Sequence, residues 1–413
     1  MDTQAFVRER FAEFYEGKAE HIEAPQSIEQ REFGFLTFKE NIMIRHKGFT
    51  TLGNLVSFVK QVVPAHAYYS TAYYEMPEEK MEDKGWLGAD LYFDIDADHI
   101  PTNCGKIHDT WTCKNKDCGF EGRGIAPETC PMCSGKSFEE RTWPCEVCLE
   151  SAKLETMKLV DILTEEFGFS LTEVNLSFSG HRGYHVHVQN EAIRQLDSVA
   201  RKEIVDYVTG VGLEPAFHGL EGSGTSRPRI VAGPGLNDVG WGSRIAKGTR
   251  ELLSAATEED LKSLGLRRRA VDEILGNRDP ILRSWVKSGP WGMIRGLGAD
   301  EWRAIVQRGV ESQSVRIDTV VTTDIHRLIR LPGSLHGKTG LLKVSFSPAD
   351  VEEFDPLKRA IAFEKGEAAV YVDQAPELRL GEERFGPFRK QKVELPLAAA
   401  LFLLCKGAAE VVD

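Results

Sequence analysis

Two aspartates, Asp94 and Asp96, stand two residues apart in the segment LYFDIDAD. The alternation of apolar and polar residues predicts a β-strand, in which both carboxylates project from the same face. Carboxylates at this spacing can share two divalent metal ions about 3.5–4 Å apart, an arrangement that assists phosphoryl transfer. A solvated strand face explains most Asp-x-Asp pairs. Here, however, Phe93 and Ile95 predict a buried strand, where paired carboxylates are costly unless a cation balances them.

A second polar group lies in SFSGHRGYHVHV, where Ser179, Arg182 and His185 surround a turn flanked by glycines. Backbone N–H groups exposed at such a turn can bind an anion, and the guanidinium fork matches phosphate oxygens. His187 shares a strand face with His185, and packing alone would explain it. The segment therefore predicts an anion site, with an ordinary hairpin turn as the alternative.

A third group occupies VTTDIHRLIRLPGSLHGKTG, where one acid is followed by several basic residues; the candidates for a site are Asp324, Arg327, Arg330, His336 and Lys338. An acid among cations suits a site that needs another metal ligand and further contacts to phosphate. A solvated basic turn is the alternative explanation when this segment is taken alone.

Seven of the eight cysteines lie in residues 104–148, mostly in closely spaced pairs, which in a reducing compartment indicates metal binding rather than disulfides. Four of them have the spacing of a zinc ribbon: Cys113, Cys118, Cys130 and Cys133. The residues that bracket this ribbon can form a second tetrahedral site: Cys104, His108, Cys145 and Cys148. Four protein ligands leave no open position on zinc, so neither site is expected to be catalytic.

The length of 413 residues predicts two or three packed units, or one large core with insertions. Apolar and charged fractions of 41% and 28% are those of an ordinary globular protein. No run approaches the roughly 20 apolar residues of a membrane helix and the N-terminus is too charged for a signal peptide, so we expect no membrane association and a cytoplasmic location. The net charge of −12 means that any binding of a polyanion must depend on local basic patches.

Periodicity predicts the elements that position these residues. Helices are expected over residues 2–18, 52–63, 151–168, 191–208, 251–264 and 270–276, and strand character over 91–98, 174–178, 184–188 and 314–324. The resulting fold class is α/β (α+β). We expect a catalytic core in three parts, residues 1–103, 149–190 and 311–413, interrupted by a zinc-binding insertion over 104–148 and a helical subdomain over 191–310.

The three polar segments, together with REFGFLTFKENIMIRHKGF and VELPLAAALFLLCKGAAE, resemble the successive signature motifs of the small subunit of archaeal and eukaryotic DNA primases. The resemblance covers nearly the whole chain. It implies the archaeo-eukaryotic primase fold, with a mixed-sheet catalytic core, a helical subdomain and a zinc-binding segment. It also implies a nucleotidyltransferase with DNA-directed RNA polymerase activity that makes short RNA primers on single-stranded DNA for replication. The choice between ribonucleotides and deoxyribonucleotides stays open.

The resemblance also implies roles for particular residues. The catalytic metals, two Mg²⁺ or Mn²⁺ ions, would bind Asp94, Asp96 and Asp324. The incoming nucleoside triphosphate would bind Ser179, Arg182, His185, Arg330 and His336. The outer cysteine group resembles the zinc motif of archaeal small subunits, whereas the inner ribbon departs from shorter members and either stiffens the segment or contacts template or partner. The implied partner is an iron–sulfur large subunit in a heterodimer.

Two other functions share some of these features. A repair or translesion polymerase of the same superfamily would use the same metal site but would extend an existing end rather than start a primer. A zinc-ribbon adaptor would bind nucleic acid without incorporating nucleotides. De novo synthesis on an unprimed template separates a primase from the repair polymerase, and the absence of any metal-dependent nucleotide incorporation would identify the adaptor.

Overall fold

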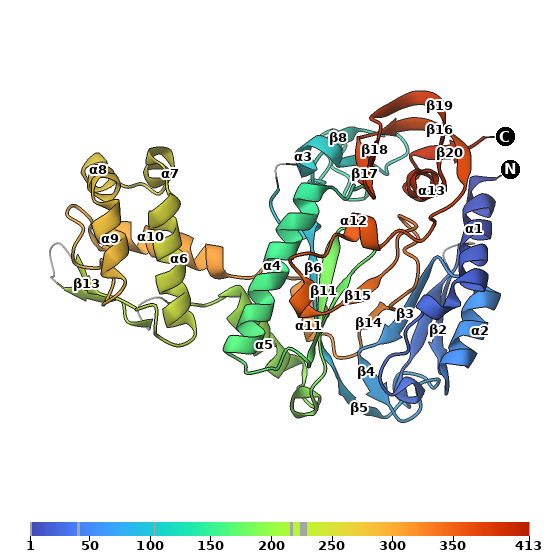
Figure 1. Cartoon of the computed structure of the whole chain (residues 1–413), viewed down its shortest axis with the longest axis horizontal. Helices are drawn as coiled ribbons and strands as arrows, with labels where there is room; N and C mark the ends of the chain where they lie inside the picture. The colour runs from blue at the N-terminus through green and yellow to red at the C-terminus, as the bar shows by residue number, and fades with distance from the viewer. Residues whose placement is uncertain (1, 39–41, 103, 215–217, 224–228, 413) are drawn as a thin grey trace. The chain divides into compact units, whose positions relative to one another are not determined.

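The computed structural model describes residues 2–38, 42–102, 104–214, 218–223 and 229–412 (Figure 1). The chain divides into two compact units. Unit 1 contains Met1–Val160, Phe169–Val205 and Arg316–Asp413, and unit 2 contains Asp161–Gly168 and Asp206–Val315. Of the region expected to be helical, residues 191–205 belong to unit 1 and the rest to unit 2. Helices and several small antiparallel sheets confirm the expected α/β class.

The first sheet of unit 1 is antiparallel, with strand order β14-β3-β1-β2. Its strands are β1 Phe33–Leu36, β2 Met43–Lys47, β3 His66–Ser70 and β14 Leu328–Arg330. Helices α1 (Thr3–Gly17) and α2 (Leu52–Val62) contact each other in this unit. Phe58 of α2 packs against Phe35 of β1 with ring centroids 5.0 Å apart, so the apolar stripe of the helix is buried on the sheet. The strand β14 brings the basic segment, which is far from β3 in sequence, next to that strand.

The second sheet carries the paired aspartates and is also antiparallel, in the order β15-β10-β11-β6. Its strands are β6 Leu91–Asp96, β10 Val174–Phe178, β11 Gly183–Val188 and β15 Val344–Phe346. In β6, Leu91, Phe93 and Ile95 are completely buried, while Asp94 and Asp96 are partly exposed on the opposite face. The register places Asp94 opposite His185, so the first two polar segments meet across neighbouring strands.

The prediction of a strand over residues 314–324 is wrong. Helix α11 (Thr319–Thr323) forms instead and lies against β6. The side chain of Asp318 caps this helix by accepting a hydrogen bond from the N–H of Val320, 3.0 Å away. A cap and tertiary contacts thus outweigh the β-propensity of the valines and threonines.

The cysteine-rich segment forms a small sheet of its own, in the order β8-β7-β9. Its elements are α3 Gly105–His108, β7 Thr110–Cys113, β8 Glu121–Arg123 and β9 Phe138–Arg141, and α4 Glu146–Glu165 follows. Trp111 of β7 packs edge-on against Phe138 of β9 with centroids 5.2 Å apart. This aromatic pair is a small core for the segment.

The C-terminal part of unit 1 is a sheet in the order β19-β16-β20 with an apolar helix beside it. The elements are α12 Pro356–Arg359, β16 Glu367–Ala375, β17 Leu378–Leu380, β18 Glu383–Phe385, β19 Phe388–Pro396, α13 Leu397–Cys405 and β20 Ala409–Val411. Figure 1 shows the two ends of the chain close together, and Val411 N donates to Thr3 Oγ1 at 3.1 Å. The unit also contains β4 Ala72–Tyr74, β5 Trp86–Ala89 and the beginning of α5 Ser198–Thr209.

Unit 2 is mainly helical around a core rich in tryptophan. Its elements are β12 Glu221–Ser223, β13 Arg229–Ala232, α6 Trp241–Ala255, α7 Glu258–Ser263, α8 Arg268–Gly276, α9 Arg278–Ser284 and α10 Ala299–Gln313. Helices α6 and α10 cross with their backbones in contact: a Cβ added to Gly309 would lie 2.8 Å from the backbone N of Thr249. The expected helix over 251–264 is two helices, because a capping box at Thr257 and Asp260 starts α7 anew.

Candidate active site and metal-binding groups

The two strand carboxylates lie in an electrostatically unfavourable environment. Burial, followed by the neighbouring carboxylates of Asp96 and Asp318, raises the pKa of Asp94 to about 7. Burial also raises the pKa of Asp96, against the opposing charge of Arg182. The ionised pair is thus costly in the protein alone, and a cation bound between the carboxylates would stabilise it.

A third acid, Asp318, lies beside Asp94. The backbone N–H of Asp318 donates to the carbonyl oxygen of Asp94 at 2.8 Å, which joins the start of α11 to β6. Sequence reasoning missed Asp318, because the wrong strand assignment gave no reason to place it near β6. Among the described contacts Asp324 is joined to neither strand carboxylate, and its Oδ1 accepts from the N–H of His326 at 2.9 Å.

The turn between β10 and β11 is held by Ser179 and requires glycine. Ser179 Oγ accepts from the N–H groups of His181, at 3.2 Å, and Gly183, at 3.1 Å. Gly180 has φ +83° and a Cβ there would lie 2.9 Å from the Cβ of His336. The close approach of this turn to His336 brings the second and third polar segments together.

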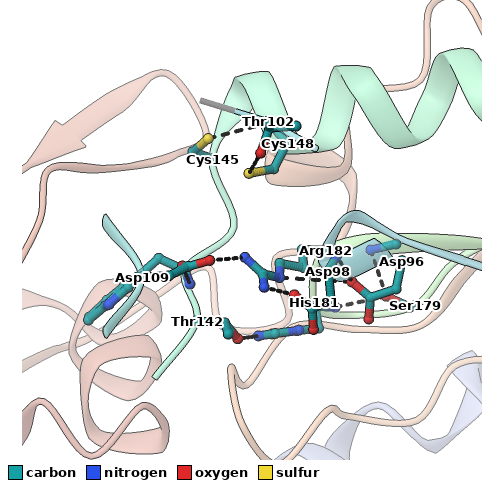
Figure 2. A network of polar contacts seen from close by, with 12 residues as sticks. Asp96, Asp98, Thr102, Asp109, Thr142, Cys145, Cys148, Ser179, His181 and Arg182 are labelled. Carbon is teal, nitrogen blue, oxygen red and sulfur yellow. Dashed lines mark hydrogen bonds and ion pairs between the residues drawn. The ribbon is translucent and has the colours of Figure 1, made fainter. Parts of the chain in front are cut away.

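Arg182 extends from this turn into a group of aspartates (Figure 2). Its Nη1 lies 2.7 Å from Asp109 Oδ2, its Nε lies 3.8 Å from Asp96 Oδ1, and Nη2 pairs with Asp98. The guanidinium is buried, and its Nε has no hydrogen-bond partner among the described residues. A buried, unpartnered donor is available to an anion such as phosphate.

Three histidines and an arginine form the adjoining part of the site. The rings of His181 and His336 stack with centroids 5.3 Å apart, and the ring of His66 meets His336 edge-on at 4.8 Å. Arg330 Nη1 donates to His66 Nδ1 at 2.5 Å. Burial, followed mainly by nearby cations, lowers the pKa of all three histidines well below the usual range. The three imidazoles are therefore neutral at pH 7, and the positive charge beside them, chiefly that of Arg330, would be balanced by an anion.

Two lysines that the sequence did not single out, the buried Lys343 and the half-buried Lys406, add to this charge. Burial, followed by the charge of Arg330, lowers the pKa of Lys343 to about 7, and its Nζ donates to the carbonyl of Arg330 at 2.7 Å. Lys406 also has its pKa lowered to about 7, by burial and then by Arg182 and Lys338. Lys406 follows α13, so only the tertiary fold brings it here.

Of the eight active-site residues predicted from sequence, the structure joins seven to a neighbour in this region. Asp94 faces His185, Asp96 faces Arg182, Ser179 holds the turn, and His336 lies against it. Arg330 reaches this group through His66, and Asp324 lies outside it in the described contacts.

The cysteines and His108 form the two groups that their spacing predicts. The outer group contains Cys104, His108, Cys145 and Cys148, and the inner group contains Cys113, Cys118, Cys130 and Cys133. Within each group the potential ligand atoms all lie within 4.8 Å of one another, so each can hold one metal ion. Four thiolate or imidazole donors are the set that tetrahedral zinc prefers. No disulfide links these cysteines.

No helix in the described parts of the chain is both long enough and apolar enough to cross a membrane.

A half-buried pair of acids beside a cluster of cations and histidines, in a mixed α/β core, is the site expected of a metal-dependent nucleotidyltransferase. The family described as "DNA primase small subunit" matches residues 131–348. Proteins named "DNA primase small subunit PriS" from Methanothrix thermoacetophila and Archaeoglobus fulgidus are 36% and 35% identical to the chain, each over 99% of both sequences. The protein of that name from Nitrosopumilus maritimus is 29% identical over 98% of both.

The chain belongs to the DNA primase small subunit family. It is therefore a DNA primase, an RNA-polymerising nucleotidyltransferase of DNA replication, and the resemblance seen in its motifs is confirmed.

Proposed function

We propose that this primase joins nucleotides on single-stranded DNA with two divalent ions held by Asp94, Asp96 and Asp318. The observation that carries the proposal is the pair of half-buried strand carboxylates, whose pKa values burial raises despite the nearby cations Arg182 and Arg327, so that further positive charge would stabilise the ionised pair. Two Mg²⁺ or Mn²⁺ ions would supply that charge and stabilise the negative charge that develops on the α-phosphate and the leaving pyrophosphate.

Asp318 replaces Asp324 as our choice for the third acidic ligand. The choice rests on the 2.8 Å hydrogen bond from Asp318 to the Asp94 backbone and on the effect of its charge on Asp94. Asp324, which the resemblance implied, is the alternative ligand. Substitutions of Asp318 and Asp324 can therefore be compared directly.

The basic side of the site would hold the triphosphate of the incoming nucleotide. The residues proposed for this role are Ser179, Arg182, His185, Arg330 and His336. The turn that Ser179 holds and the unpartnered Nε of Arg182 support phosphate binding. With the triphosphate fixed there, the 3′-hydroxyl of a template-bound nucleotide can attack the α-phosphate in line and release pyrophosphate.

The two cysteine groups would each hold a structural zinc ion. Both donor sets provide four protein ligands, so neither leaves a position open for water or substrate. The zinc ions would therefore stabilise the segment between β6 and α4 rather than take part in bond formation.

A large subunit, an iron–sulfur protein in our proposal, is the expected partner, and single-stranded DNA and nucleoside triphosphates are the expected substrates. Several relatives carry the name small subunit, which supports such a partner. The net charge of −12 also favours help with template binding, because the chain as a whole repels DNA.

Primer synthesis on an unprimed circular single-stranded DNA, with labelled nucleoside triphosphates and Mn²⁺, tests this function. The proposal predicts short products that begin without a pre-existing end and increase when the large subunit is added. Extension of a supplied primer without any new starts would instead favour a repair polymerase, and binding without incorporation would favour an adaptor.

A further inference from the structure

Asp109 lies between the outer cysteine group and the candidate active site (Figure 2). The residue follows the short helix α3, which carries His108, and its side chain is 7% exposed. Both carboxylate oxygens are used: Oδ1 accepts from His108 and from the N–H of Trp143, and Oδ2 accepts from Arg182. One buried carboxylate thus connects a potential metal ligand with a residue proposed to bind nucleotide.

The contact with Asp109 determines which nitrogen of His108 faces the metal-binding group. Nδ1 of His108 donates to Oδ1 of Asp109 at 2.7 Å, so Nε2 is left as the lone-pair nitrogen. Nε2 lies 3.3 Å from Cys145 Sγ and 3.6 Å from Cys148 Sγ, inside the outer group. A carboxylate that accepts from a histidine in this way fixes the tautomer and ring orientation of a metal ligand.

The other oxygen of Asp109 orients Arg182. Nη1 of Arg182 lies 2.7 Å from Oδ2, and the N–H of Trp143 donates to Oδ1 at 2.9 Å and fixes the carboxylate on the backbone. The remaining nitrogens of the guanidinium face Asp96 and Asp98. Asp109 therefore sets one of three contacts that determine where this guanidinium points.

We propose that Asp109 is a positioning residue that couples the outer metal site to nucleotide binding by orienting His108 and Arg182 at the same time. A metal ion on Nε2 holds the imidazole, the imidazole and Trp143 hold the carboxylate, and the carboxylate holds the guanidinium. Loss of the metal would leave the hydrogen bonds of His108 and Asp109 less constrained and would therefore displace Arg182. The inference rests on the proposed role of Arg182 in binding the triphosphate.

The first test compares Asp109→Asn with Asp117→Asn, an exposed aspartate of the same segment whose side chain makes none of these contacts. An amide in place of the Asp109 carboxylate has only one accepting oxygen, so it cannot accept from both His108 and Arg182. We expect outer-site zinc affinity, measured by competition with a chelator, to fall about 10–100-fold. ATP affinity, measured calorimetrically with Mn²⁺ but without template, should fall with it. Asp117→Asn should match the wild type in both.

The second test needs no change at Asp109, so it stands even if Asp109→Asn fails to fold. Because coupling between two ligands is reciprocal, saturating ATP should slow the chelator-driven release of outer-site zinc. The measurement is made in a Cys130→Ser/Cys133→Ser background, which lacks the inner ribbon site, so that only zinc released from the outer site is detected. The same measurement in Arg182→Ala is the control, because without the guanidinium ATP should no longer protect the zinc.

The outcomes separate this inference from the proposed function. If Arg182→Ala binds ATP as tightly as the wild type, the proposed role of Arg182 is wrong. If Arg182→Ala loses ATP affinity but ATP leaves zinc release unchanged, or a folded Asp109→Asn keeps both affinities, the coupling through Asp109 is wrong. If Asp109→Asn lowers zinc affinity but leaves ATP affinity unchanged, the coupling is also wrong. In that case Asp109 would orient His108 at the metal site without affecting nucleotide binding.

Discussion

Nε2 of His185 lies 3.5 Å from Oδ1 of Asp94, across the antiparallel strands β11 and β6. Burial lowers the pKa of His185 well below its usual range and raises the pKa of Asp94 to about 7, so each group resists becoming charged. The contact places a proposed nucleotide-binding residue next to a proposed metal ligand. The residues proposed to bind metal and those proposed to bind phosphate are therefore neighbours within one sheet.

Replacing the third acid should distinguish Asp318 from Asp324. Asp318→Asn is expected to reduce nucleotide incorporation about 10²–10³-fold, a loss typical of removing a group that stabilises transition-state charge. Asp324→Asn should cost less than about tenfold, because its contact is with the backbone of His326. Incorporation rates at saturating Mn²⁺ measure both. The reverse order of effects would restore Asp324 as the ligand.

The phosphate pocket can be tested by nucleotide binding alone. Arg182→Ala and His336→Ala should each weaken ATP binding about 10–100-fold, because each removes a hydrogen bond to a charged group. Affinity for single-stranded DNA, measured by fluorescence anisotropy, should hardly change. Normal ATP affinity combined with reduced DNA affinity would mean that these side chains contact template instead.

The stability of the protein should depend on pH through a buried ion pair at the start of β6. Arg31 Nη2 lies 2.6 Å from Asp90 Oδ2, with side chains 0% and 1% exposed, and His187 Nε2 lies 3.0 Å from the same oxygen. These partners hold the pKa of Asp90 below its usual value despite burial. The stabilisation is therefore present above about pH 4, the unfolded pKa, and is lost as the pH falls further.

Asp90→Asn should accordingly lower the free energy of unfolding by about 3–5 kcal/mol at pH 7, because it leaves Arg31 buried without its counter-charge. Urea titrations at pH 7 and pH 3 measure the loss, and the difference from the wild type should shrink at the lower pH. Asp373→Asn, at an exposed position of β16, is the control. An equal loss at both pH values would contradict the electrostatic explanation.

Metal analysis of the purified chain should give about two zinc ions, one for each cysteine group. Cys130→Ser/Cys133→Ser should retain about one zinc and most of its activity, because the outer group is unaffected. A wild-type content of one zinc, or loss of both ions from the double variant, would show that the ligands are shared differently.

Local spacing was enough to predict the parts of the site that lie close together in sequence. Asp94 and Asp96 share a face because they are two residues apart on one strand, and the cysteine pairs show their grouping by spacing alone. Asp318 was missed because its neighbours favour a strand, whereas its own side chain caps a helix. Lys343, Lys406 and His66 could not have been found, since only the tertiary fold brings these distant residues to the pocket.

The most direct test of the central claim is nucleotide incorporation by Asp94→Asn and Asp96→Asn at saturating Mn²⁺. Each variant removes charge that the metals need and also removes a half-buried carboxylate whose pKa is raised by burial, so the fold should persist with equal or greater stability. We predict folded proteins, verified by circular dichroism and thermal unfolding, with no detectable primer synthesis. Near-normal primer synthesis by either folded variant would contradict the assignment of the catalytic metal site to β6.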